Sequence, residues 1–218
     1  LEIDTQLNRI HSFKWTSIPI NDEYCPKDVK LEDILNHYKH IADQKYSRVI
    51  TRLKRQLTHP SWYQETELGG FLADILQESL RLDMMLLGSG SVRVAELGPI
   101  ILLSDLTECL PYDDSAIALW VNGAQLKQMI SFMLRDEVWS GSHCEFFQFS
   151  KDVRVVYHRS SHTFKELSLY GKPVEDTQIY KIGLQYYFYL NLKDFFSISH
   201  EEIEKNGKPR MIATSCRE

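Results

Sequence analysis

The sequence predicts an α+β fold in which a mixed β-sheet domain follows a long helix. Apolar residues recur at helical spacing between residues 28 and 57, as in an extended amphipathic helix. Helical and strand patterns then follow one another irregularly, whereas a doubly wound parallel sheet would alternate them strictly. Beyond residue 141 the apolar residues change to a period of two, which indicates half-buried strands of a sheet.

The first 60 residues are predicted to form an N-terminal extension that ends in a connector helix. Residues 1–27 lack a sustained pattern, and Asp28 is placed to cap a helix of about 30 residues. His59–Pro60 would end this helix, because the residue before a proline disfavours the helical region. A helix of this length suits an arm or a link between two domains. Its apolar positions are Leu31, Ile34, Leu35, Tyr38, Ile41, Ala42, Val49, Ile50, Leu53 and Leu57.

Residues 61–198 carry the elements of the predicted domain. A helix from about Glu67 to Leu82, with Thr66 as its N-cap, is followed by a short apolar strand at Met84–Leu87. The elements expected after these are a strand at Ile100–Leu103, a short helix capped by Ser104 and ending near Leu110, a strand at Ala116–Val121, a helix from Asn122–Gly123 that buries Leu126, Met129, Ile130, Met133 and Leu134, and strands at Phe146–Phe149, Val153–His158, Phe164–Tyr170 and Ile179–Gln185. The tail, residues 199–218, is charged and is predicted to be frayed.

Composition and charge narrow the classes of partner. The 218 residues carry a net charge of −5 with scattered lysine and arginine, so we expect no nucleic-acid partner. No apolar run approaches the ~20 residues that span a bilayer, so we expect no membrane partner. The four cysteines form no Cys-x-x-Cys pair or Cys/His cluster, so we expect no metal site, while two disulfides remain compatible with their spacing. The cellular compartment stays open.

The loop Gly88–Arg93 has a composition that can grip a ligand. Its two glycines let backbone N–H groups approach closely, and Arg93 adds a planar fork of donors suited to phosphate or carboxylate. By itself this Gly-x-Gly is weak evidence, and its spacing alone favours an ordinary tight turn. No third glycine completes a dinucleotide-binding fingerprint.

The turn at Leu110–Asp114 is a second candidate for ligand binding. The aromatic face of Tyr112 could stack on a nucleobase, a contact that contributes about 1–3 kcal/mol in single-strand systems. Cys144 beside His143 does not indicate a nucleophile and base, because adjacent residues do not normally meet in that geometry.

The order of these segments resembles the C-terminal, substrate-binding domain of the 5'-nucleotidase family. Leu68–Asp74 is similar to its Leu-Gly-Asn helix start, and Asp83–Leu87 is similar to its Asp-Ile-Ala-Leu strand. Gly88–Arg93 resembles its Gly-Gly-Gly-Ile-Arg loop, and Leu110–Asp114 resembles its Leu-Pro-Phe-x-Asn turn. The resemblance extends roughly from Glu65 to Phe196.

The resemblance implies a domain that binds a nucleotide or nucleoside while another domain of the same chain hydrolyses the phosphate ester. That partner would be an N-terminal metallophosphoesterase domain with two divalent metals, so neither catalytic residues nor a cofactor is expected in these residues. In the family two aromatic side chains sandwich the base; by position they would be Tyr112 and, from the end of the last strand, Tyr186 or next Phe188. The substrate-binding residues implied are Ser89, Gly90, Arg93, Tyr112, Asp114, Tyr186 and Phe188.

Several positions depart from the family pattern. Trp62 and Tyr63 stand where an arginine is expected, which leaves Arg93 as the one clearly retained of three. Gly70 replaces the asparagine of the helix start, and Asn191–Phe196 replaces a Gly-Gly-Asp-Gly-Tyr run. The alternative hypothesis is therefore an interaction module that keeps the fold and has lost the nucleotide site.

Overall fold

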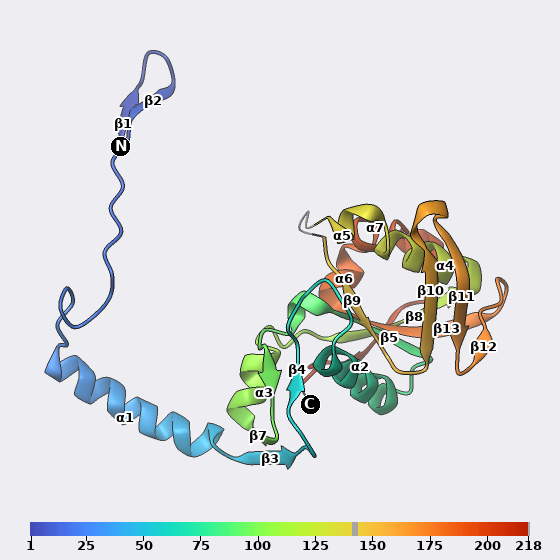
Figure 1. Cartoon of the computed structure of the whole chain (residues 1–218), viewed down its shortest axis with the longest axis horizontal. Helices are drawn as coiled ribbons and strands as arrows, with labels where there is room; N and C mark the ends of the chain where they lie inside the picture. Colours follow the sequence, from blue (N-terminus) through green and yellow to red (C-terminus); the bar gives the residue numbers. More distant parts are fainter. Residues whose placement is uncertain (141–143, 218) are drawn as a thin grey trace. The chain divides into compact units, whose positions relative to one another are not determined.

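The computed structural model describes residues 1–140 and 144–217, and the chain divides into two compact units, Leu1–Lys45 and Tyr46–Glu218 (Figure 1). The first unit contains an antiparallel pair of short strands, β1 (Glu2–Asp4) and β2 (Arg9–Ser12), and nearly all of helix α1 (Val29–Tyr46). Every residue of α1 is described and none is buried.

Helix α1 begins where the sequence predicts. The Asp28 carboxylate accepts the N–H groups of Lys30 and Leu31 at 2.9 and 3.2 Å, as an N-cap residue does. None of the helices in the described part of the chain is long and apolar enough to cross a membrane.

The predicted length of this helix is wrong, because α1 ends at Tyr46 rather than near residue 57. The chain continues into strand β3 (Val49–Arg52), which pairs antiparallel with β7 (Ile100–Leu102). Val49, Ile50 and Thr51 are three consecutive β-branched residues, which favour a strand over a helix. Their apolar side chains matched the helical period, but the distant partner strand decides the conformation.

A five-stranded mixed sheet with the order β14-β8-β13-β5-β9 forms the centre of the second unit. β13 runs parallel to β5, whereas the other neighbouring pairs are antiparallel. This arrangement confirms the predicted α+β fold with a mixed sheet. The strands are β5 (Met84–Gly88), β8 (Ala116–Asn122), β9 (Phe147–Phe149), β13 (Ile179–Gln185) and β14 (Arg210–Ala213).

Helices cover both faces of this sheet. Residues Leu68, Leu72 and Leu76 of α2 (Glu67–Leu80) pack in one apolar cluster with Met85 and Leu87 of β5. Helix α4 (Gly123–Met133) and helix α7 (Leu192–Phe196) contribute to the other cluster, which includes Met84 and Leu86. Successive side chains of a strand point to opposite faces, so the uninterrupted apolar run of β5 results from its burial on both sides.

The C-terminal residues belong to the fold, so the prediction of a frayed tail is wrong. Helix α8 (His200–Glu204) is capped by Ser199, whose hydroxyl accepts the Glu202 N–H at 3.2 Å. β14 then pairs with β8 at the edge of the sheet. The apolar run of β14 is only a few residues long and lies among charged residues, so it is too short to show a strand period in the sequence.

Shorter elements connect these layers. Helix α3 (Leu103–Cys109) begins one residue before its predicted cap, Ser104; the Asp105 carboxylate instead accepts the Leu102 N–H at 2.7 Å. The remaining elements are β4 (Leu57–Thr58), β6 (Glu96–Leu97), α5 (Asp136–Trp139), β10 (Val153–His158), β11 (Thr163–Leu169), β12 (Lys172–Pro173) and α6 (Tyr186–Leu190), with single 3-10 turns at Ser89–Ser91 and Arg159–Ser161.

Candidate functional site

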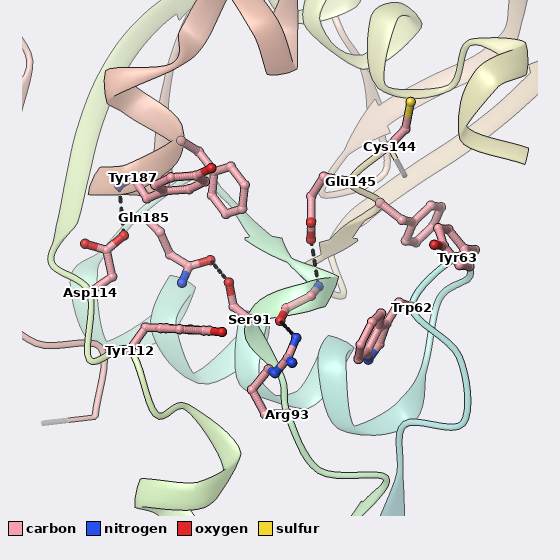
Figure 2. Close-up of a pocket in the computed structure, with 13 residues that line it drawn as sticks. Trp62, Tyr63, Ser91, Arg93, Tyr112, Asp114, Cys144, Glu145, Gln185 and Tyr187 are labelled. Atoms are coloured by element: carbon pink, nitrogen blue, oxygen red, sulfur yellow. Dashed lines mark hydrogen bonds between the residues drawn. The ribbon is translucent and has the colours of Figure 1, made fainter. Parts of the chain in front are cut away.

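A cavity of about 580 Å³ lies beside the loop that follows β5, and its size is typical of small-molecule sites (Figure 2). Its walls come from five segments that are distant in sequence: the chain before α2, the loop after β5, the turn after α3, the residues before β9 and the start of α6. The lining residues are Trp62, Tyr63, Gly90, Ser91, Arg93, Tyr112, Asp114, Cys144, Glu145, Phe146, Gln185, Tyr187 and Phe188.

The loop is held in place by the chain beneath it. Gln185 Oε1 accepts both the Gly88 N–H at 3.1 Å and the Ser91 hydroxyl at 3.0 Å. Ser89 is fully buried, and its hydroxyl accepts the Gln148 side-chain amide at 2.9 Å. Ser89, a predicted substrate contact, therefore serves the interior, whereas Gly90 and Ser91 line the cavity.

A buried histidine ties the same loop to the start of α2. His59 Nε2 lies 3.1 Å from the Ser89 carbonyl oxygen, and its Nδ1 lies 2.7 Å from the hydroxyl of Thr66, the N-cap of α2. A carbonyl only accepts, so Nε2 carries the proton and Nδ1 accepts from Thr66 in the neutral ring. Burial lowers the pKa of His59, which favours this neutral form.

Gly90 lies between an acid and a base. Its N–H donates to Glu145 Oε1 at 2.7 Å, while its carbonyl oxygen accepts from Arg93 Nη1 at 3.2 Å (Figure 2). The Arg93 guanidinium also lies over the Trp62 ring, 4.9 Å from the ring centroid. Burial raises the pKa of Glu145, and the Gly90 N–H and the charge of Arg93 oppose that shift. Arg93 is at the cavity, as the sequence predicts, but it is engaged by its own chain.

Tyr112 projects into the cavity from a turn that the C-terminus holds. Its side chain is 68% exposed, which leaves the ring face open to a ligand. The Asp113 carboxylate pairs with Arg217 at 2.6 Å, and the Asp114 carbonyl accepts the Cys216 N–H at 2.9 Å. The turn is thus fixed by residues about a hundred positions away in the chain.

Asp114 lines the cavity, but both of its carboxylate oxygens already accept backbone N–H groups. Oδ1 accepts from Ser115 at 2.8 Å, and Oδ2 accepts from Tyr187 at 2.8 Å. The second bond connects the turn that carries Tyr112 to the first turn of α6. Asp114, predicted as a ligand contact, therefore positions two aromatic residues relative to one another.

Of the two tyrosines that begin α6, Tyr187 lines the cavity and Tyr186, the predicted partner of Tyr112, does not. The last strand ends at Gln185, as the sequence predicts, and the chain turns directly into α6, so residues 186–189 lie on a helix. Tyr186 instead stacks on Tyr189, with ring centroids 5.9 Å apart, and packs against the core. Phe188 reaches the cavity wall but is 3% exposed, and its ring packs against Phe147. Tyr187 is 57% exposed and free to contact a ligand.

The lining residues that were not predicted as substrate contacts are Trp62, Tyr63, Ser91, Cys144, Glu145, Phe146, Gln185 and Tyr187. One signal was available for Tyr187: four successive aromatic residues, 186–189, do not alternate as a half-buried strand does. Glu145 had no local signal, because only the fold brings it to Gly90, 55 residues away. His143, which was considered beside Cys144, lies outside the described residues.

Among residues 1–140 and 144–217, no group of three or more His, Cys, Asp or Glu side chains is arranged to hold a metal ion. The four cysteines are free thiols: Cys25 is exposed, Cys109 is buried, and Cys144 and Cys216 are partly buried. Burial raises the pKa of Cys109 to about 11, so this thiol stays protonated.

Comparison with known proteins identifies the family. The family described as "5'-nucleotidase, C-terminal domain" matches residues 41–199. This chain belongs to that family. The match begins within α1 and covers all five segments that build the cavity, including the glycine loop, the Tyr112 turn and α6.

Relatives of this 5'-nucleotidase C-terminal domain are parts of longer proteins. An uncharacterized metallophosphoesterase, YunD of Bacillus subtilis (strain 168), is 26% identical over 131 residues, which are 60% of this chain and 28% of that protein. The chain therefore spans less than a third of this relative's length.

Solved structures of the family share the fold. The 5'-nucleotidase precursor of Thermus thermophilus matches with a TM-score of 0.69 and 18% identity, over 89% of this chain and 40% of that one. A putative 5'-nucleotidase from Staphylococcus aureus, in complex with α-ketoglutarate, matches with a TM-score of 0.63 and 12% identity, over 94% of this chain and 41% of that one. At these identities the likeness establishes architecture alone.

Proposed function

We propose that this chain is the nucleotide- or nucleoside-recognition domain of a 5'-nucleotidase-like metallophosphoesterase. The catalytic domain, with two divalent metals that activate water for attack on a phosphate ester, would lie outside residues 1–218. The family membership supports the class of enzyme, and the curated relative is a metallophosphoesterase of greater length.

The observation that carries the proposal is the pair of exposed aromatic rings, Tyr112 and Tyr187, on one cavity. Figure 2 draws the two rings on the same side of the cavity, with Gln185 between them in this view. The Asp114 bond to the Tyr187 N–H fixes their spacing. Two such rings can hold a planar base by stacking, which every nucleobase provides.

Gln185 supplies a polar group for the same ligand. Its Oε1 is held by Gly88 and Ser91, which orients the amide and directs the nitrogen toward the Tyr112 side of the cavity (Figure 2). An oriented amide donor beside stacking rings suits the acceptor atoms on the edge of a base or the hydroxyls of a ribose. The isolated domain is expected to bind adenosine in the range of about 0.1–10 mM, because one stacked base supplies only a few kcal/mol after the cost of immobilisation.

Titration of the ¹⁵N-labelled chain with adenosine tests the proposal. Tyr112→Ala and Tyr187→Ala should each weaken binding between severalfold and about a hundredfold, the range set by the loss of one stacking contact. Tyr24→Ala, which removes an exposed tyrosine from the other compact unit, is the matched control and should bind as the wild type does. The absence of shifts at the cavity up to about 10 mM adenosine would favour the interaction module instead.

A further inference from the structure

The groups that would receive a phosphate at the glycine loop are already engaged by this chain. A loop of this kind binds anions through backbone N–H groups, with an arginine adding charge. Here the Gly90 N–H donates to the Glu145 carboxylate at 2.7 Å. Arg93 donates to the Gly90 carbonyl at 3.2 Å and lies over Trp62. A phosphate would have to displace a carboxylate that the protein itself supplies.

The fit between Glu145 and the loop is close. A Cβ atom added at Gly90 would lie 3.0 Å from Glu145 Oε2, so the second carboxylate oxygen also rests against the loop. Glu145 enters from the segment before β9, on the opposite wall of the cavity from the aromatic pair (Figure 2). Its position is therefore part of the folded site and does not depend on the loop alone.

The charges that line the cavity disfavour a further anion. Arg93 is the one basic side chain among the lining residues that the structure describes, whereas Glu145 and Asp114 are both acidic. A phosphate monoester carries nearly two negative charges at neutral pH. Placed at the loop, it would lie against Glu145, where like charges a few ångströms apart repel strongly.

We propose that Glu145 occupies the anion position of the Gly88–Arg93 loop, so that this cavity takes a nucleoside, or the uncharged nucleoside part of a larger compound, in preference to a group that places phosphate at the loop. The inference rests on the proposed function and specifies its ligand class. A phosphate on the same compound would point away from the loop.

The test compares adenosine, adenosine 5'-monophosphate and inorganic phosphate as ligands of the wild type, Glu145→Gln and Glu145→Asp. Amide shifts of Gly90 and Arg93 report on the loop. The glutamine keeps an acceptor for Gly90 and removes the charge, whereas the aspartate keeps the charge. Glu201→Gln removes the same charge from an exposed position on α8 and is the matched control.

The wild type should bind the monophosphate no more tightly than adenosine, and inorganic phosphate should leave Gly90 unshifted. In Glu145→Gln the ratio of monophosphate to adenosine affinity should rise roughly tenfold or more, because one like charge near the phosphate is removed. Inorganic phosphate should then shift Gly90. Glu145→Asp and Glu201→Gln should keep the wild-type ratio.

An unchanged ratio in Glu145→Gln, or a wild type that already prefers the monophosphate with Gly90 shifted, would overturn the inference. If neither the wild type nor any variant binds a nucleoside, the proposed function fails. The role of Glu145 is then tested by inorganic phosphate alone: if phosphate does not shift the Gly90 amide in Glu145→Gln, that role is refuted. Glu145→Ala, which also removes the carboxylate, replaces the glutamine variant if that variant does not fold.

Discussion

The coupling between the Tyr112 turn and α6 can be tested by removing the carboxylate of Asp114. Asp114→Ala deletes the acceptor of the Tyr187 N–H, a bond of 2.8 Å between residues 73 positions apart, and the local bond from Ser115. Hydrogen bonds to charged groups contribute about 1.5–3 kcal/mol each, but the Tyr187 bond is exposed and water can replace the lost acceptor. We therefore expect the free energy of unfolding to fall by about 1–2 kcal/mol.

The binding effect should exceed what the loss of stability alone explains, because Tyr187 loses the bond that fixes its spacing from Tyr112. Adenosine affinity should fall by about three- to tenfold in Asp114→Ala, while Asp114→Asn, which retains one carbonyl acceptor for Tyr187, should lose less. Urea unfolding and adenosine titration of the three proteins measure the two quantities. Equal loss of binding in the asparagine and alanine variants would show that the carboxylate charge contacts the ligand, and the positioning role would be refuted.

Two further outcomes follow from buried groups near the loop. Gly88→Ala would place a Cβ in the space of the Phe188 ring, so overpacking should lower the free energy of unfolding, measured with urea, by about 1–3 kcal/mol. Gly70→Ala is the control, because an added Cβ there meets nothing closer than 4.0 Å, and its urea midpoint should stay the same or rise. Gly171→Ala is unsuitable as a control because Gly171 has a positive φ. The lowered pKa of His59 means that the unfolded chain binds its proton first as pH falls. The free energy of unfolding contributed by neutral His59 should be fully present above the pKa of the unfolded chain, near 6.5, and should be lost as pH falls through the lower pKa of the folded protein. His59→Asn should remove this part of the dependence of stability on pH. An unchanged dependence would contradict the assignment of a neutral His59 ring.

Local sequence was sufficient for the elements whose apolar pattern matches their burial in the core. The run Met84–Leu87 is short and apolar throughout, as a strand buried on both faces requires, and Leu126, Met129 and Ile130 share the buried face of a helix. Thr66 and Asp28 mark the starts of two helices, because each side chain accepts a backbone N–H three residues further along the chain. The family resemblance, read from the order of short motifs, likewise survived comparison with the whole fold.

Tertiary structure decided the features that depend on partners far along the chain. Residues 49–52 follow a helical apolar period, yet β7 supplies hydrogen bonds that make them a strand. The Asp114 carboxylate accepts the Tyr187 N–H in the first turn of α6, and Tyr187 rather than Tyr186 lines the cavity. Glu145 meets Gly90 across 55 residues. Periodicity and capping report on neighbours within a few positions, whereas a binding site is assembled by contacts between segments that only the fold brings together. For this reason Arg93 and Asp114 could be predicted from local motifs, but Glu145 and Gln185 could not.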